Sequence, residues 1–316
     1  MHISTSRYLK LSAAPERLNA ILAIEVTEHS FLPNIDEILS DWVATIATPA
    51  FKLIRQREGA KPAFCSIGSG VGLDALAAIE ILDATDIGIT DVHEDVVAAA
   101  AANIRANLRD PARIALNAGS GDLLQPLATA RPRYDLIYEN LPNVPVAAAA
   151  DLATARLSSG HMPPRAEAIP DLLRKNLLAL HYVALTQAKD FLCPDGSVLS
   201  LIGGRIPLAV FEKMGELAGY RSEIFTYGWK IQTDPDEMIP GHLAQQRDGL
   251  GPYHFYRAAR LAEVFASVNL ADSGKRALEI EQLLAPDQLD PQQALAAHQR
   301  GETIGHTVVA LRSFPA

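Results

Sequence analysis

Glycines and acidic residues recur at the points where apolar segments of this sequence end. The stretch CSIGSGVGLDAL contains Gly68, Gly70 and Gly72, and glycine lets a backbone turn tightly and approach a ligand closely. About 20 residues further on, the next apolar segment ends at Asp91, whose carboxylate can accept hydrogen bonds from both hydroxyls of a ribose. A third segment ends in Ser-Gly-Asp-Leu-Leu, which contains Asp122. This order predicts a binding site for a ligand that contains adenosine.

The spacing of the glycines indicates which adenosine ligands fit. The dinucleotide fingerprint G-x-G-x-x-G needs a Gly or Ala at position 73, where this chain has Leu73. The phosphate-binding P-loop ends in Gly-Lys followed by Ser or Thr, and this sequence has no such run. The pattern therefore disfavours NAD and favours a different adenosine ligand.

A polar segment follows the fourth apolar stretch, YDLIYENLPNVP. The stretch begins like a strand and then continues as Glu139-Asn140-Leu141-Pro142-Asn143, which no strand would extend. Ligands of open α/β sheets lie beyond the carboxyl ends of the strands, so we expect this segment to face the ligand. Pro142 fixes the backbone there. Glu139 can hold a cationic amine or guanidinium group and take up its proton.

The elements that must position these residues form an α/β pattern. From residue 63 to residue 232 short apolar strands alternate with helical segments, and a last apolar strand covers 306–313. We expect a Rossmann-like, seven-stranded, mostly parallel sheet with helices on both faces. The division expected along the chain is an N-terminal helical cap over 1–58, a ligand-binding domain over 59–232 and 304–316, and a helical insertion over 233–303. Within the cap, 14–29 and 34–56 carry apolar residues at helical spacing.

Composition limits the partners. The chain has 316 residues, a formal net charge of −9, 48% hydrophobic residues and two cysteines. An acidic chain repels phosphate backbones, so we expect no nucleic-acid partner. No apolar window is long enough to span a membrane, and so few cysteines favour a reducing, cytoplasmic location without disulfides. No cluster of His and Cys has the spacing of metal ligands, so we predict no metal.

With these residues in place, residues 60–232 and the final strand resemble the class I S-adenosylmethionine-dependent methyltransferases. The resemblance implies S-adenosyl-L-methionine as cofactor and S-adenosyl-L-homocysteine as product. It implies that the three glycines hold the methionine part, that Asp91 holds the ribose, and that Asp122 bonds the adenine amine. The other cofactor-binding residues that it implies are Val92 and His93 at the adenine, Gly121 and Leu123 beside Asp122, and Ser66 before the glycines. The family usually has Asp or Glu where Ser66 stands.

The segment after the fourth strand resembles the Asn-Pro-Pro-Tyr motif of the branch that methylates nitrogens. This chain has Asn140-Leu141-Pro142-Asn143, so two of the four residues match. The resemblance implies that the Asn140 side chain and the Leu141 main-chain carbonyl accept hydrogens from a substrate nitrogen, with Pro142 and Glu139 completing the catalytic segment. Asn143 cannot stack on a flat substrate as the motif's Tyr does, which disfavours a nucleobase.

The substrate expected from these features is a small molecule. We expect an N-methyltransferase for an amine, amino acid or guanidine of specialised metabolism. Two alternatives stay open: a protein methyltransferase for glutamine or lysine side chains, and a non-catalytic cofactor-binding protein. The insertion over 233–303 is either a lid over the site or the interface of a homodimer. The candidate substrate-binding residues are Asn143, His161, Tyr227, Trp229 and Tyr253.

Overall fold

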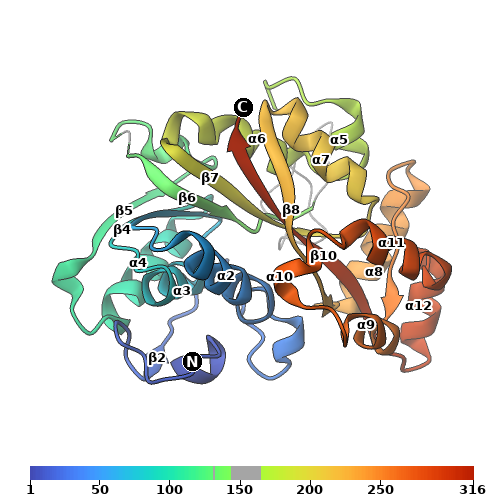
Figure 1. Ribbon diagram of the computed structural model, residues 1–316, viewed down its shortest axis with the longest axis horizontal. Helices are drawn as coiled ribbons and strands as arrows, with labels where there is room; N and C mark the ends of the chain where they lie inside the picture. Colours follow the sequence, from blue (N-terminus) through green and yellow to red (C-terminus); the bar gives the residue numbers. More distant parts are fainter. Residues whose placement is uncertain (131, 144–164) are drawn as a thin grey trace. The chain divides into compact units, whose positions relative to one another are not determined.

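The computed structural model describes residues 1–130, 132–143 and 165–316 (Figure 1). The chain forms two compact units, each described here by itself. The first unit comprises Met1–Asn140 and Gln187–Leu199, and the second comprises Leu141–Thr186 and Ser200–Ala316. The three segments expected from the sequence follow different boundaries, and they stay predictions.

Parallel strands form the centre of the first unit. β3 (Ala63–Ile67) pairs in parallel with β4 (Asp86–Asp91) on one side and with β6 (Tyr134–Glu139) on the other, and β4 pairs in parallel with β5 (Ala115–Ser120). The strand order is β5-β4-β3-β6-β7, where β7 (Leu192–Gly203) passes from the first unit into the second. Nearly all side chains of β3, β4 and β6 are buried, as a parallel sheet covered on both faces requires.

Helices pack on these strands. α3 (Leu73–Ile81) packs on β3, and α4 (Glu94–Asn107) packs on β4 and β5 (Figure 1). The alanines of α4 bring its backbone close to the sheet, and Ala99, Ala100 and Ala101 are all buried. The chain enters α2 (Thr48–Glu58) through a π-helical turn, and α2 packs against α3. The short turns of this unit are η1 (Ile38–Ser40), η2 (Val43–Ala47), η3 (Pro111–Arg113), η4 (Gln125–Leu127) and η6 (Lys189–Phe191).

The prediction of a helix over residues 14–29 is wrong. The N-terminus instead forms β1 (His2–Ser4), the single turn α1 (Thr5–Tyr8) and β2 (Ile21–Ala23), with β1 and β2 antiparallel. Two asparagines of α4 explain the extended backbone. Asn107 accepts from the Ala23 amide at 2.7 Å and donates to its carbonyl at 2.9 Å, and Asn103 makes the same two bonds to Glu25 at 2.8 Å each. The side-chain amides thus take the place of a neighbouring strand.

The second unit holds the strand order β7-β10-β8. β8 (Tyr220–Ile231) lies at the edge and pairs antiparallel with β10 (Ile304–Pro315), with a register shift between Ala310 and Leu311. The two-residue strand β9 (Tyr256–Arg257) also pairs with β10. Together the strands of the two units confirm the mostly parallel α/β sheet expected from the sequence.

The apolar pattern of 172–192 predicts one long helix, but the structure shows it interrupted. α5 (Asp171–Lys175) ends before α6 (Ala179–Ala188), and Leu177 between them has a left-handed backbone with φ of 61°. The Asn176 side chain donates to the Leu172 carbonyl at 2.8 Å, which closes the end of α5. Asn143, in the segment that follows β6, donates to the Leu177 carbonyl at 3.4 Å. This segment therefore contacts the break between α5 and α6.

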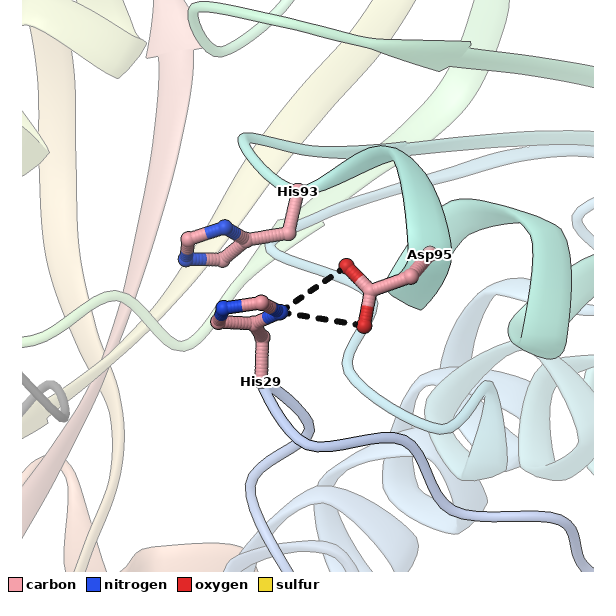
Figure 2. Close-up of side chains that lie close together, drawn as sticks. All are labelled: His29, His93 and Asp95. Carbon is pink, nitrogen blue, oxygen red and sulfur yellow. Dashed lines mark hydrogen bonds and ion pairs between the residues drawn. The ribbon is translucent and has the colours of Figure 1, made fainter. Parts of the chain in front are cut away.

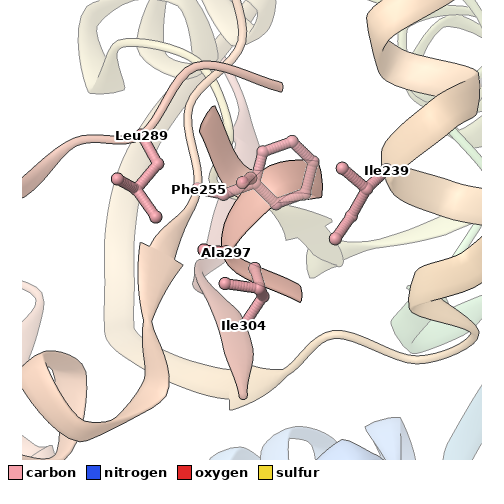
Figure 3. Packing of buried hydrophobic residues seen from close by; sticks show 6 residues of the cluster. Ile239, Phe255, Leu289, Ala297 and Ile304 are labelled. Atoms are coloured by element: carbon pink, nitrogen blue, oxygen red, sulfur yellow. The ribbon is translucent and has the colours of Figure 1, made fainter. Parts of the chain in front are cut away.

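The segment before the last strand is helical, as expected. It contains a small apolar core in which Phe255 lies between Ile239 and Leu289 (Figure 3), with Ala294, Ala297 and Ile304 completing the cluster. α12 (Pro291–Gln299) begins with a capping box of Asp290 and Gln293. The helices of the unit besides α5 and α6 are α7 (Leu208–Leu217), α8 (Pro235–Arg247), α9 (Ala258–Phe265), α10 (Leu270–Ser273), α11 (Ala277–Leu284), η7 (Ala285–Asp287) and α12 (Pro291–Gln299). Across the described ranges, every helix is too short or too polar to cross a membrane.

The asparagine bridges can be tested by their contribution to stability. Asn103→Ala removes three hydrogen bonds, one of them to the Val71 carbonyl at 3.0 Å, and leaves backbone groups unpaired. We expect a loss of about 1–3 kcal/mol in the free energy of unfolding, measured by urea denaturation. Asn117→Ala is the control, because half-buried Asn117 makes one bond, to Asp86 at 3.2 Å. Equal losses in the two variants would contradict the bridging role.

Candidate functional site

The glycine loop between β3 and α3 lies where the sequence predicts it. Gly68, Gly70 and Gly72 have φ of 70°, 47° and 85°, a region that other residues rarely adopt. The loop is tied to the end of β4, because the amides of Gly68 and Ser69 donate to the Thr90 carbonyl at 2.8 and 2.9 Å. A side chain at Gly72 would meet the Ala100 carbonyl at 3.2 Å, whereas Gly70 faces open space. Gly72 is therefore needed for packing, and Gly70 leaves room above the loop.

Asp91 ends β4 directly beside this loop. Its carboxylate accepts from the Gly70 amide and from the His93 amide, both at 3.3 Å. Burial raises the pKa of Asp91, and these backbone donors act against that rise. The parallel pairing of β3 with β4 brings the glycine loop and the acid together, as the sequence predicts.

Ser66 is fully buried, and a carboxylate stands beside it. The Ser66 hydroxyl donates to Asp74 Oδ2 at 3.2 Å, and Asp74 lies in the first turn of α3. Burial raises the pKa of Asp74 to about 7, against the opposing effect of the Ser66 hydrogen bond. A carboxylate from the first turn of α3 thus lies beside Ser66. The sequence motif alone does not predict this, because the side chains meet only after the loop has turned.

Asp122 is held by a residue that the sequence analysis missed. Gln187 of α6 donates to Asp122 Oδ2 at 3.2 Å and accepts from the Leu124 amide at 3.1 Å. Gly121 donates to the Asp91 carbonyl at 2.8 Å, so the ends of β4 and β5 are linked. Leu123 is buried, with a left-handed backbone at φ of 50°. The predicted acid is therefore held by Gln187 just after the end of β5, although nothing in the sequence points to Gln187.

Val92 and His93 differ in their surroundings. Val92 is 61% exposed, next to the half-buried Asp91. The His93 ring stacks on His29 with centroids 4.5 Å apart and planes 13° apart (Figure 2). His29 Nδ1 lies 3.1 Å from both carboxylate oxygens of Asp95 in α4. Burial alone would raise the pKa of Asp95, but hydrogen bonds with Thr27 and His29 lower it overall.

His29, His93 and Asp95 also offer three metal-ligating groups. One ligand atom of each lies within 4.8 Å of the others, and this grouping joins residues that are distant in the sequence. Lone pairs of an imidazole lie in the ring plane, so two nearly parallel rings direct theirs side by side and do not converge on one point. Metal binding would require one ring to turn. The arrangement is a hydrogen-bonded His-Asp pair with a stacked ring, and the absence of a metal stays a prediction.

The segment after β6 spans the point where the chain leaves the first unit. Glu139 is fully buried and pairs in register with Ile67, just before the glycine loop. Asn140 is half-buried and ends the first of the two stretches of chain that make up the first unit. In the second unit Leu141 is buried, and Pro142 and Asn143 are half-buried. The expected position of β6 beside β3 is therefore observed, and Asn140 follows it at the carboxyl edge.

The remaining candidate substrate-binding residues belong to the second unit or lie outside the described residues. Tyr227 is buried, its amide donates to Ser273 Oγ at 3.0 Å, and its ring lies 5.8 Å from that of Phe265. Trp229 is half-buried on the edge strand β8. Tyr253 is buried against His242, with ring centroids 5.0 Å apart. His161 lies outside the described residues.

Comparisons with protein-family models and with curated proteins gave no match. Three solved structures illustrate what this chain is similar to. A ribosomal protein L11 methylase from Lactobacillus delbrueckii subsp. bulgaricus is 20% identical, with 56% of this chain and 71% of that chain covered and a TM-score of 0.35. A methyltransferase from Pyrococcus furiosus is 14% identical, with 64% and 80% covered and a TM-score of 0.38. The YcgJ protein from Bacillus subtilis is 10% identical, with 84% and 97% covered and a TM-score of 0.44. All three scores lie below 0.5, so the chemistry must be judged from this chain's own residues.

Asp74 gives this site a measurable pH dependence. Its folded-state pKa of about 7 lies above the unfolded value of about 3.9, so the folded protein binds more protons between these pH values. Stability therefore falls as pH rises through this window, by at most about 4 kcal/mol. We expect Asp74→Asn to remove this dependence, so that the stability difference between variant and wild type grows from pH 4 to pH 8. Denaturant unfolding across this range measures it, and a constant difference would contradict a raised pKa.

Proposed function

We propose that this protein is an S-adenosylmethionine-dependent methyltransferase. The observation that carries the proposal is the alignment of three strand ends in the first unit. The glycine loop follows β3, Asp91 ends β4 and contacts that loop through the Gly70 amide, and Asp122 follows β5. One adenosine ligand requires a glycine turn, an acceptor for the ribose and an acceptor for the adenine in this order, and the glycine loop, Asp91 and Asp122 match it.

The residues present fit the cofactor. Gly70 faces open space where a ligand can approach the backbone. The buried Ser69 hydroxyl has no hydrogen-bond partner within the described ranges, so the loop offers an unpaired polar group there. Val92 exposes an apolar side chain next to Asp91, as expected for a residue covered by the adenine ring. Asp74 brings a carboxylate next to Ser66, the position where the family usually has Asp or Glu.

Each group has a defined task in this proposal. Asp91 would accept both ribose hydroxyls, and Asp122, held by Gln187, would accept from the adenine amine. The glycine loop would hold the methionine part. Bound S-adenosylmethionine supplies a methyl group already activated on a sulfonium sulfur. The protein's contribution is alignment of the nucleophile and exclusion of water, which can supply several kcal/mol.

Nitrogen is the proposed acceptor atom. Asn140 at the end of β6 and the Leu141 carbonyl would accept the hydrogens of a substrate nitrogen, which aims its lone pair at the methyl group. Pro142 restricts the backbone that presents this carbonyl. Buried Glu139 would receive the proton that an ammonium group must lose before it can react. Support for this assignment comes from the residue types and from the pairing of β6 with β3.

The proposed substrate is a small amine, amino acid or guanidine. The net charge of −9 and the lack of an aromatic residue at Asn143 argue against nucleic acid. Two free cysteines agree with a reducing compartment, so the proposed location is the cytoplasm. A homodimer remains a prediction. Methylation of a glutamine or lysine side chain in a protein is the alternative that the first experiment separates.

The deciding experiment uses S-adenosylmethionine with a labelled methyl group. The protein is incubated with it and an extract of the host, and the extract is then separated by size. We expect label in the small-molecule fraction. Label in proteins would favour the alternative substrate, and no label despite cofactor binding would favour a non-catalytic role.

Two variants should separate binding from turnover. Asp91→Ala should weaken cofactor binding about 10- to 100-fold, because charge-assisted hydrogen bonds contribute about 1.5–3 kcal/mol. Asn140→Ala should lower turnover while cofactor affinity stays within about threefold. Calorimetry measures the affinity and label transfer the turnover. Asp110→Ala is the control for loss of an acid, since Asp110 is exposed. Unchanged affinity in Asp91→Ala would contradict the assigned site, and parallel losses in Asn140→Ala would indicate a structural role.

A further inference from the structure

An arginine in the second unit is buried without a counter-charge. Arg205 follows β7 by two residues and is 5% exposed. Its Nη2 donates to Gln232 Oε1 at 2.6 Å, and its guanidinium carbon lies 5.5 Å from the centre of the Phe255 ring. Arg205 Nε has no hydrogen-bond partner among the residues that the structure describes. Within the described chain, no carboxylate pairs with this guanidinium. Burial lowers the pKa of Arg205 to about 9.

The groups around Arg205 do not supply the missing negative charge. Burial, followed by the charge of Arg205, lowers the pKa of His242 to about 3 and that of His254 to about 4. Both imidazoles are therefore neutral at pH 7. His306 is fully buried and its pKa is lowered by burial, Arg205 and Lys230. Arg205 thus lies close to three neutral histidines, and a buried cation without an anion is costly.

Packing holds the guanidinium in place. Phe255 under it is fixed by the apolar cluster drawn in Figure 3. Gln232 is oriented by the bond from its Nε2 to the Thr233 carbonyl at 2.7 Å, so its oxygen stays directed at Arg205. The Arg205 carbonyl accepts from the His254 amide at 3.0 Å. The guanidinium is thus already ordered, so a ligand that binds it loses little free energy to ordering of this side chain.

Asn143 links this arginine to the Asn-Leu-Pro-Asn segment. A Cβ added at Gly203 would lie 2.2 Å from Arg205 Nη1 and 3.7 Å from Asn143 Oδ1. The glycine therefore leaves the space that the guanidinium occupies, and Asn143 borders the same space. The end of the proposed substrate-binding segment and the uncompensated cation are neighbours within the second unit.

We propose that Arg205 binds the carboxylate of the substrate, which makes the substrate an amino acid and not a simple amine or guanidine. The planar guanidinium offers parallel N–H donors that match a carboxylate, and its free Nε–H belongs to one such pair. A cationic substrate without an acid would meet only positive charge at this point. The identification of the ligand as the substrate rests on the proposed methyl transfer. The anion-binding site itself does not depend on that proposal.

The substrate class can be tested with chemically altered extracts. The small molecules of the extract are split, and in one half the carboxylic acids are esterified with acidic methanol. We expect wild-type protein to transfer labelled methyl groups to carboxylate-containing products in the untreated half and at least tenfold less in the esterified half. Equal transfer in both halves, or label only in products without a carboxylate, would overturn the assignment of Arg205.

Variants test the residue itself. Arg205→Met should raise the KM for the labelled acid at least tenfold and leave cofactor affinity unchanged, and Arg205→Lys should recover part of the loss. Arg221→Met is the matched control, because exposed Arg221 also lies over an aromatic ring, 5.3 Å from the centre of Phe314. Thermal unfolding separates a binding role from a structural one. A ligand-binding arginine predicts an equal or higher Tm for Arg205→Met, and a lowered Tm together with unchanged KM in Arg205→Lys would overturn the proposal.

Failure of methyl transfer leaves a separate test of the anion site. Should wild-type protein bind the cofactor but methylate nothing, the proposed function fails. Thermal unfolding in sodium acetate and in sodium chloride at equal ionic strength then decides about Arg205. A larger acetate-dependent rise in Tm for wild type and Arg221→Met than for Arg205→Met supports the site. Equal rises in the three proteins would overturn it.

Discussion

Parallel pairing of β3 with β4 and β6 is the constraint on which the candidate cofactor site depends. It brings the carboxyl ends of the strands to one edge, so Gly68 to Gly72, Asp91 and the end of β6 become neighbours. The contact of Asp91 with the Gly70 amide follows directly from this register. Without it, an acid and a glycine loop separated by some 20 residues would share no ligand.

The parts of the site that could be predicted from the sequence are those fixed by local rules. Glycines at 68, 70 and 72 follow an apolar strand, and only glycine adopts their positive φ at low cost. Asp91 could be predicted because a strand ends where its apolar run ends. The alternation of strands and helices then determined the fold class. Each of these inferences uses residues close together in the chain, where periodicity and turn chemistry are informative.

The features that could not be predicted from the sequence all depend on contacts between residues that are distant in the chain. The segment 14–29 has helical spacing of apolar residues, yet side-chain amides of Asn103 and Asn107 satisfy its backbone in an extended form. Asp74 joins Ser66 only because the glycine loop reverses the chain. Gln187 lies in a helix and Arg205 in a loop, and the sequence of neither segment indicates a binding residue. Their roles depend on which groups the fold brings near them, and no local pattern encodes that.

Buried charges of opposite sign mark both candidate sites. Asp74 in the first unit and Arg205 in the second are each 8% exposed or less, and burial disfavours the charged form of both. A protein shaped by stability alone would lose such groups, since apolar residues of similar volume are usually tolerated at least as well. Strongly shifted pKa values gather where ligands bind, because a bound ligand of opposite charge recovers the cost. An acid beside the proposed cofactor loop therefore suits a cationic sulfonium ligand, and a cation beside Asn143 suits an anionic group.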